Sequence, residues 1–226
     1  MMDSGNINIG CSIFFSYYLM PDILKKFTTL YPHIDITLTD ASASNLDRLL
    51  NDEEIDLIID TKDEEKKNCD YVPIVEEKIL LAVPSSFKCN ETIRQFALTP
   101  KDLYSGKIDY SSVKSVSLDK FKDENFILLK SGNNMYTKTH SLFDSNNISP
   151  KVSFRLDLLA TSYALTAAGN GISFVTDTIF KNKLVNDDVL LYDINGLGKR
   201  TVYLIKKKNR YTTNAINKFI DTIKFK

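Results

Sequence analysis

Strand-like and helix-like segments alternate along this chain, and this order limits the possible folds more than any other feature. Polar and apolar residues alternate in residues 6–10, as in a strand, and residues 16–30 then carry Leu, Ile and Phe side chains at helical spacing. A second strand, residues 34–38, leads to a helix that we expect Ser44 to cap. The nearly apolar residues 55–59 are typical of a strand in a parallel sheet with helices on both faces. The sequence therefore predicts an α/β fold whose strands are joined by helices.

The same alternation resumes in the second half of the chain. We expect strands at 126–129, 152–154 and 172–175, with helices at 136–143 and 158–168 between them. These segments predict a second β/α module that follows the first.

Other segments connect or close the two modules. The apolar strand 78–83 can leave the first sheet and enter a second one, residues 201–205 predict a returning strand, and residues 214–223 predict an amphipathic final helix. Between residues 85 and 125 the pattern weakens, and we expect only short helices, at 91–98 and 100–103.

Composition excludes several classes of protein. With 226 residues and 43% hydrophobic content the chain can bury a core, and its 29 basic and 29 acidic residues cancel, so no overall field favours nucleic acid. Cys11, Cys69 and Cys89 have neither zinc-site nor disulfide-framework spacing, which favours a reducing cytoplasm. No signal peptide and no run of 18 apolar residues is found, so we expect no membrane association.

Several short motifs follow one another in an order known from one family. They are Gly5-Asn6-Ile7-Asn8-Ile9-Gly10, Leu19-Met20-Pro21 with Phe27 and Tyr31-Pro32, Asp56-Leu57-Ile58-Ile59, Pro73-Ile74-Val75-Glu76-Glu77, Leu80-Leu81-Ala82-Val83-Pro84 and Ala167-Ala168-Gly169-Asn170-Gly171-Ile172. Together they span nearly the whole chain, and they resemble the effector-binding (substrate-binding) domain of LysR-type transcriptional regulators.

This resemblance implies a fold of two Rossmann-like subdomains joined by two crossover strands, similar to type 2 periplasmic binding proteins. Subdomain I would comprise residues 1–82 and 206–226, and subdomain II residues 83–205, with crossings near Val83 and Ile205. An effector would bind in the cleft between the subdomains.

The resemblance also implies partners. The expected partners are a small-molecule effector and further copies of the chain in a homodimer or homotetramer, which residues 16–30 and 136–143 would help to form. DNA would be bound only through an N-terminal helix-turn-helix domain, which this chain lacks. The chain also departs from the family in residues 87–115, which are longer than usual.

Polar loops that follow the predicted strands are the candidate effector site. Ligands in open α/β sheets bind beyond the carboxyl ends of strands, where helix N-termini present unpaired N–H groups that favour anions. A carboxylate-bearing metabolite is therefore the expected effector. The candidate residues are Ser12, Ile13, Phe14, Ser42, Ser44, Ser131, Gly132, Asn133, Leu158 and Thr176.

Each candidate also has an ordinary structural explanation. Ser and Asn cap helices in any fold, so the loop hydroxyls can serve that purpose alone. Phe14, Phe15, Phe154 and Phe174 can line a pocket, but aromatic residues beside strands more often belong to the core. Lys130 or Arg155 can neutralise a ligand, although cations at strand ends are usually solvated.

The sequence predicts neither an enzyme nor a cofactor or metal site. His33 and His140 lack metal-ligand spacing, and Gly169-Asn170-Gly171 follows a helix, as a C-cap and turn do, instead of opening one around a phosphate. We expect the basic run 206–210 to be a solvated loop. The main alternative is a free-standing or transporter-associated solute-binding protein, which would require export, and an enzyme on the same fold would require acid, base or nucleophilic residues.

Overall fold

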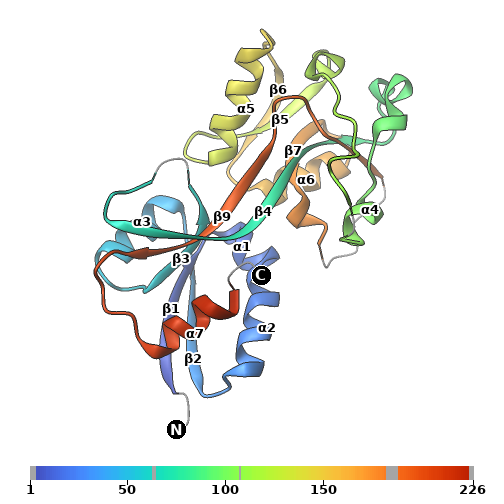
Figure 1. Cartoon of the computed structure of the whole chain (residues 1–226). Coiled ribbons are helices and arrows are strands. Elements are labelled where there is room, and N and C mark those ends of the chain that lie inside the picture. Colours follow the sequence, from blue (N-terminus) through green and yellow to red (C-terminus); the bar gives the residue numbers. More distant parts are fainter. Residues whose placement is uncertain (1–3, 63–64, 107, 182–187, 224–226) are drawn as a thin grey trace. The chain divides into compact units, whose positions relative to one another are not determined.

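The chain forms two compact units that share two long strands (Figure 1). The computed structural model describes residues 4–62, 65–106, 108–181 and 188–223. Unit 1 comprises Met1–Glu76 and Thr201–Lys226, and unit 2 comprises Glu77–Arg200. The chain therefore passes from one unit to the other inside β4 (Cys69–Pro84) and again inside β9 (Lys199–Lys207). The subdomain limits near Val83 and Ile205 stay a prediction.

Unit 1 contains a mixed sheet with the strand order β2-β1-β3-β9. Strand β1 pairs in parallel with β2 and β3, and β3 pairs antiparallel with β9. Its elements, besides parts of β4 and β9, are β1 (Gly5–Cys11), α1 (Ile13–Tyr18), α2 (Met20–Leu30), β2 (Ile34–Asp40), α3 (Ala43–Asn51), β3 (Leu57–Thr61) and α7 (Asn214–Ile223).

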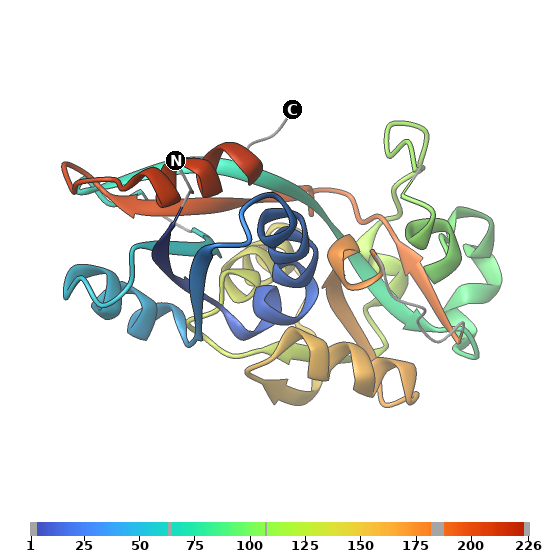
Figure 2. The same ribbon diagram turned by 90° about the horizontal axis from the view of Figure 1, so that it is seen from below.

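Both faces of the unit 1 sheet are covered by helices (Figure 2). Because side chains alternate along a strand, Leu57 and Ile59 pack with α1, α2 and α7, whereas Ile58 packs with α3. Phe27 of α2 and Phe219 of α7 meet at 5.1 Å between ring centroids in the larger core. Helices on opposite faces leave the loops at the strand ends exposed.

The single helix predicted for residues 16–30 is wrong in one respect, because the structure has two helices there. Helix α1 ends and α2 begins around Leu19, whose N–H donates to the Phe15 carbonyl oxygen at 2.9 Å. Pro21 occupies the first turn of α2, the part of a helix in which a residue without an N–H is tolerated. A continuous helix through Pro21 would have lost a backbone hydrogen bond.

Unit 2 contains a sheet with the order β4-β7-β5-β6, and β8 pairs with β4. Strand β5 is parallel to β6 and β7, while β4 is antiparallel to β7 and β8. Its elements are η1 (Lys88–Thr92), η2 (Arg94–Phe96), α4 (Pro100–Tyr104), η3 (Leu118–Phe121), β5 (Asn125–Leu129), α5 (Asn134–Ser145), β6 (Lys151–Leu156), α6 (Leu159–Ala167), β7 (Ile172–Thr176), η4 (Asp177–Ile179) and β8 (Val189–Tyr192).

The turn between α6 and β7 confirms the interpretation of its glycines. Gly169 adopts φ +83° directly after the C-cap Ala168, and Gly171 adopts φ +146° before β7. Both angles lie in the region that favours glycine, so this segment ends a helix and turns the chain.

Candidate functional site

The first candidate loops lie at the carboxyl ends of β1 and β2 in unit 1. Cys11 is paired with Asp40, and the Ala41 N–H donates to the Cys11 carbonyl oxygen at 3.1 Å. The loops that contain Ser12 and Ser42 therefore start from neighbouring strand ends, as the sequence predicts for parallel strands.

The serines in these loops have the backbone position of helix caps. Ser12 precedes α1 and Ser42 precedes α3, so the prediction that Ser44 caps the second helix is wrong. Within the described chain neither Ser12 nor Ser42 accepts a capping hydrogen bond through its side chain, and the Ser42 and Ser44 hydroxyl oxygens lie 3.3 Å apart. These hydroxyls are therefore not used to cap their own helices.

Ile13 and Phe14 differ in exposure. The Ile13 side chain is 47% exposed, whereas Phe14 is half-buried and packs on the unit 1 core, with its ring 5.2 Å from that of Phe15. Phe15 and Phe174 are core residues, while Phe154 is 41% exposed.

A buried cysteine lies near two carboxylates at this edge of unit 1. Burial raises the pKa of the Cys11 thiol, and the nearby Asp60 and Asp40 carboxylates raise it further. Burial also raises the pKa of Cys69 and raises that of Cys89 to about 12. The three thiols are thus protonated near neutral pH.

A cation at the end of β3 was missed by sequence reasoning. The Lys62 ammonium lies 3.9 Å from the ring centroid of Tyr71 and 4.1 Å from that of Tyr203, and it also contacts the Glu65 carboxylate. Ammonium groups are attracted to the faces of aromatic rings. Because Lys62 stands in a polar stretch whose ring partners are remote in sequence, no local pattern signals this arrangement.

In unit 2, the loops after β5 and β6 lie next to each other. The Lys130 N–H donates to the Leu156 carbonyl oxygen at 2.8 Å, so the loop with Ser131 and Gly132 starts beside the loop with Leu158. Ser131 is exposed and Gly132 has φ +90°. The Lys130 side chain pairs with Asp157 at 2.8 Å on the surface.

The remaining unit 2 candidates have defined structural contacts. The Asn133 side chain accepts from the Met135 N–H at 3.0 Å and so caps α5, while Leu158 precedes α6 and is 41% exposed. Thr176 is fully buried, and its hydroxyl donates to a Glu77 carboxylate oxygen at 3.1 Å. Thr176 thus supports the interior of unit 2.

Glu77 belongs to a buried polar network that sequence reasoning did not find. It forms an ion pair with Arg200, and the next residue, Lys78, pairs with Asp193 at 2.7 Å. Asp177 accepts from the Lys78 N–H at 3.1 Å and from the Tyr110 hydroxyl at 3.2 Å. Burial raises the pKa of both Asp177 and Tyr110.

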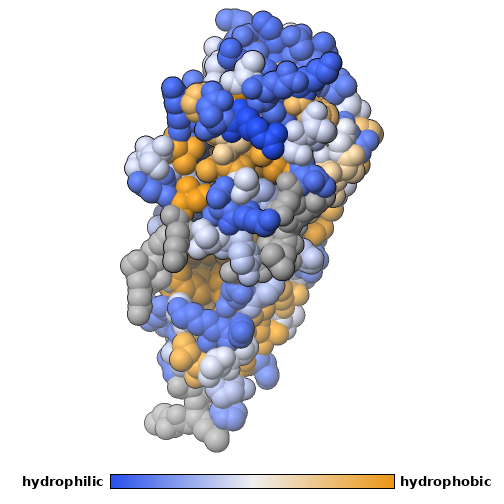
Figure 3. All heavy atoms as spheres, turned by 90° about the vertical axis from the view of Figure 1, so that its right-hand side faces the viewer, coloured by the Kyte–Doolittle hydropathy of each residue, from blue (hydrophilic) through white to orange (hydrophobic). Residues whose placement is uncertain are grey.

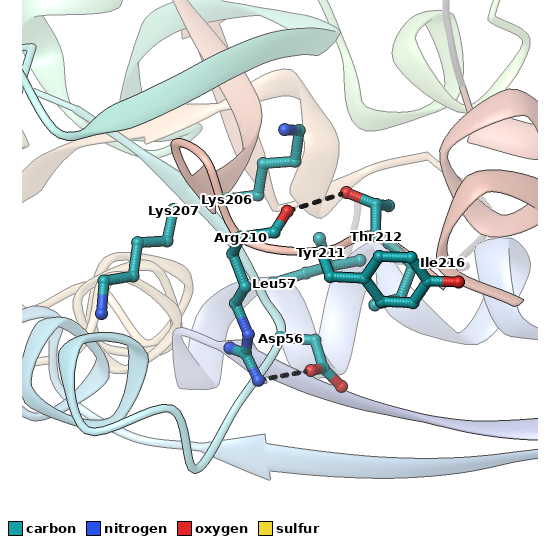
Figure 4. A pocket seen from close by; sticks show the side chains of 8 residues that line it. All are labelled: Asp56, Leu57, Lys206, Lys207, Arg210, Tyr211, Thr212 and Ile216. Carbon is teal, nitrogen blue, oxygen red and sulfur yellow. Dashed lines mark hydrogen bonds and ion pairs between the residues drawn. The ribbon is translucent and has the colours of Figure 1, made fainter. Parts of the chain in front are cut away.

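The basic run 206–210 forms ion pairs, which corrects its interpretation as a merely solvated loop. A small pocket in unit 1 is lined by Asp56, Leu57, Lys206, Lys207, Arg210, Tyr211, Thr212 and Ile216 (Figure 4). Arg210 points to Asp56 at 2.9 Å, Lys206 pairs with Asp70 and Lys207 with Glu53. The cations of this pocket therefore have protein counter-ions.

The described residues meet the requirements of neither a metal site nor a membrane-spanning helix. Residues 4–62, 65–106, 108–181 and 188–223 include no cluster of His, Cys, Asp and Glu suited to a metal ion, and none of their helices has the length and apolarity to cross a bilayer. His140 stacks on Tyr136, with 3.7 Å between the ring centroids.

A match to a family model identifies the family to which this fold belongs. The model for the LysR substrate binding domain matches residues 2–225. This chain belongs to the LysR substrate-binding-domain family. The resemblance inferred from the sequence motifs is confirmed, and the match supports the regulatory interpretation and not the transporter-associated alternative.

Relatives and solved structures agree with this family. The chain is 25% identical to the uncharacterized HTH-type transcriptional regulator YcgK of Bacillus subtilis (strain 168) over 95% of its own length, but it spans only 65% of that relative. The effector binding domain of QuiR in complex with shikimate matches with a TM-score of 0.75 at 20% identity, over 98% of this chain and 96% of that one. The regulatory domain of Synechocystis PCC6803 CcmR in complex with 2-PG matches with a TM-score of 0.77 at 18% identity, over 97% and 96%. The predicted α/β fold of LysR effector-binding domains is thereby confirmed.

Proposed function

We propose that this chain is the sensing domain of a LysR-type transcriptional regulator and that it binds a small carboxylate-bearing metabolite through the loops at its strand ends. The observation that carries the proposal is the pair of neighbouring loops after β1 and β2, whose serine hydroxyls cap neither helix, on a chain of the LysR substrate-binding family. A second set of loops, after β5 and β6, offers Ser131, Gly132 and the N-terminus of the 12-residue helix α5.

The charges of the two sets favour different chemical groups. Helix N-termini attract anions, so the start of α5 suits a carboxylate. The Asp40 carboxylate at the end of β2 suits hydroxyl or ammonium groups, which donate hydrogen bonds to carboxylates. The proposed effector is therefore a carboxylate that also carries hydrogen-bond donors.

A thermal-shift screen of hydroxy and amino carboxylates, with shikimate and 2-PG included, tests the proposal. A ligand at about 100 times its dissociation constant stabilises the folded chain by about 2.7 kcal/mol. Loss of a hydrogen bond to a charged group costs about 1.5–3 kcal/mol, so Ser42→Ala and Ser131→Ala should each weaken binding about ten- to hundredfold.

Ser145→Ala is the matched control, because this exposed serine bonds within α5, to the Ser141 carbonyl oxygen at 2.7 Å. A ligand whose affinity changes with neither site variant would contradict the proposed loops. A screen in which no carboxylate shifts the unfolding temperature would contradict the ligand class.

The regulatory output belongs to the same proposal. In the whole protein a helix-turn-helix domain would bind DNA in the cytoplasm, and a homodimer or homotetramer would carry the effector signal to it. The intact mass and N-terminal sequence of the native protein test this, since a chain without such a domain would contradict DNA binding.

A further inference from the structure

One buried ion pair joins β4 and β9 at the points where these strands begin and end their unit 2 segments. Glu77 and Arg200 are the first unit 2 residues on β4 and β9, and their side chains are 0% and 7% exposed. The Ile79 N–H also donates to the Gly198 carbonyl oxygen at 3.3 Å, which ties the two strands together one step further on.

The same point is bonded to the end of β7. Thr176 donates its hydroxyl to Glu77, and the following residue, Asp177, accepts the Lys78 N–H. Two successive residues of β4 are thus held by two successive residues at the end of β7. A shift of β4 by one residue would turn Glu77 to the opposite face and break all of these contacts.

The segment after α4 is attached to this network as well. Tyr110 donates to Asp177, and Ser115 donates to another carboxylate of the network, Asp193, at 2.9 Å. The Val116 N–H also donates to the Asp193 carbonyl oxygen at 2.8 Å. This gives the unusually long stretch 87–115 a structural attachment at the point where β4 enters unit 2.

The small net free energy of a buried ion pair argues that this network does more than stabilise the fold. A buried ion pair contributes little net stability compared with apolar side chains of similar volume, because both charges lose their hydration. In some proteins buried polar or ionic groups instead specify one arrangement among several. The charged groups around these two points of the chain are therefore suited to fixing the register of β4 and β9 in unit 2.

We propose that Glu77, Lys78, Thr176, Asp177, Asp193 and Arg200 form a register lock that fixes β4 and β9 to unit 2. The juxtaposition that carries this proposal is the buried Glu77–Arg200 pair at both crossings with Thr176 and Asp177 at the end of β7. Bending of the two shared strands is then confined to the unit 1 side, in residues 69–76 and 201–207. The proposal stands independently of the identity of the effector.

Hydrogen–deuterium exchange of this chain, followed by mass spectrometry, tests the lock. The double variant Glu77→Gln with Arg200→Met removes both charges, and amides of residues 77–82 and 198–204 should exchange at least about tenfold faster through local opening. Amides of α5 and β6, and those of unit 1 outside residues 201–204, should keep their rates. The matched control is Arg48→Met with Glu54→Gln, an exposed pair at 3.0 Å in unit 1.

Two results would overturn the lock. One is unchanged exchange in residues 77–82 of the double variant, and the other is a uniform rise throughout unit 2, which a merely stabilising pair would produce. If the double variant does not fold, Thr176→Val decides, because it removes only the hydroxyl that donates to Glu77. Faster exchange confined to the same amides supports the lock, and unchanged exchange in that variant rejects it.

Discussion

At the scale of single residues, Gly171 stands where a side chain has no room. A Cβ atom there would lie 2.6 Å from the Asn125 carbonyl oxygen, at φ +146°. Gly171→Ala should therefore destabilise unit 2 by more than the cost of about 1–2 kcal/mol for an L-residue at positive φ. Urea unfolding at equilibrium measures this difference.

Gly169→Ala is the control for this prediction. Gly169 has φ +83°, but no atom of the described residues lies within 4 Å of the point that a Cβ would occupy. The variant should show only the cost of the backbone angle. Equal destabilisation by the two variants would mean that Asn125 moves away without cost.

Asp177 makes the stability of unit 2 depend on pH. Its pKa is raised above the ordinary value of 3.8, first by burial and against the attraction of Lys181, while Glu77 raises it and the Lys78 N–H lowers it. The neutral carboxyl is thus favoured by folding, and the stability it contributes is present below pH 3.8 and is lost as the pH rises through the raised pKa. Asp177→Asn should abolish this loss, so the unfolding free energy of the variant relative to wild type should increase as the pH rises above 3.8.

Asp70 supplies the opposite sign as a control. The hydrogen bond from Lys206 lowers its pKa, so its contribution is present above the ordinary pKa and is lost as the pH falls. Asp70→Asn should therefore flatten the acid side of the stability curve. If the unfolding free energy of Asp177→Asn relative to wild type decreases as the pH rises, burial does not raise the Asp177 pKa.

The candidate residues show which part of a site a sequence reveals. The loops with Ser12, Ser42 and Ser131 follow strands that the local pattern identifies, and so their positions at strand ends could be predicted. The partners Glu77 and Arg200 are 123 residues apart, and no spacing rule connects them. Thr176 was predicted from its position after a strand, although burial directs its hydroxyl to Glu77.

At the scale of elements, α2 is an amphipathic helix with one buried and one exposed face. Phe27 is fully buried and packs against Phe219 and Tyr31, whereas Lys25 on the same helix is exposed. Removal of a buried Phe side chain leaves a cavity, so Phe27→Ala should cost about 3–5 kcal/mol. Lys25→Ala should stay within about 0.5 kcal/mol of wild type. Chemical denaturation of both variants checks the difference, and similar values for the two would contradict the helix orientation.

Elements with a clear period were predicted, and elements defined by tertiary pairing were not. The amphipathic helix at 214–223 and the strand at 126–129 carry their own signal, and the structure confirms both. Strand β8, Val189–Tyr192, has only four residues and exists through its pairing with β4. The first half of β4 mixes charged with apolar residues, because side chains there pair with β9 residues such as Lys206.

At the scale of the whole molecule, a formal net charge of zero hides strong local organisation. The basic run 206–210 forms ion pairs with Glu53, Asp56 and Asp70 in unit 1. The carboxylates of the register lock form ion pairs with Lys78, Lys181 and Arg200 in unit 2. The paired charges lie within each unit, and several large apolar side chains are exposed.

Those apolar side chains lead to a prediction about self-association. Tyr17 on α1 and Leu30 on α2 are 60% and 56% exposed, within residues 16–30, which the family resemblance assigns to contact between chains. On the face drawn in Figure 3, hydrophobic residues form separate patches among hydrophilic ones. Leu30→Glu places a charge in that contact and should shift the chain towards monomer in sedimentation velocity runs.

Tyr104→Glu is the matched control, because Tyr104 on α4 is also 50% exposed but lies outside the predicted contact. It should leave the sedimentation coefficient unchanged. If Leu30→Glu sediments as wild type does while Tyr104→Glu dissociates, the chains associate through unit 2 at α4. A charged residue costs most association free energy where it is fully desolvated. The larger decrease in sedimentation coefficient therefore identifies the surface that is buried more deeply when the chains associate.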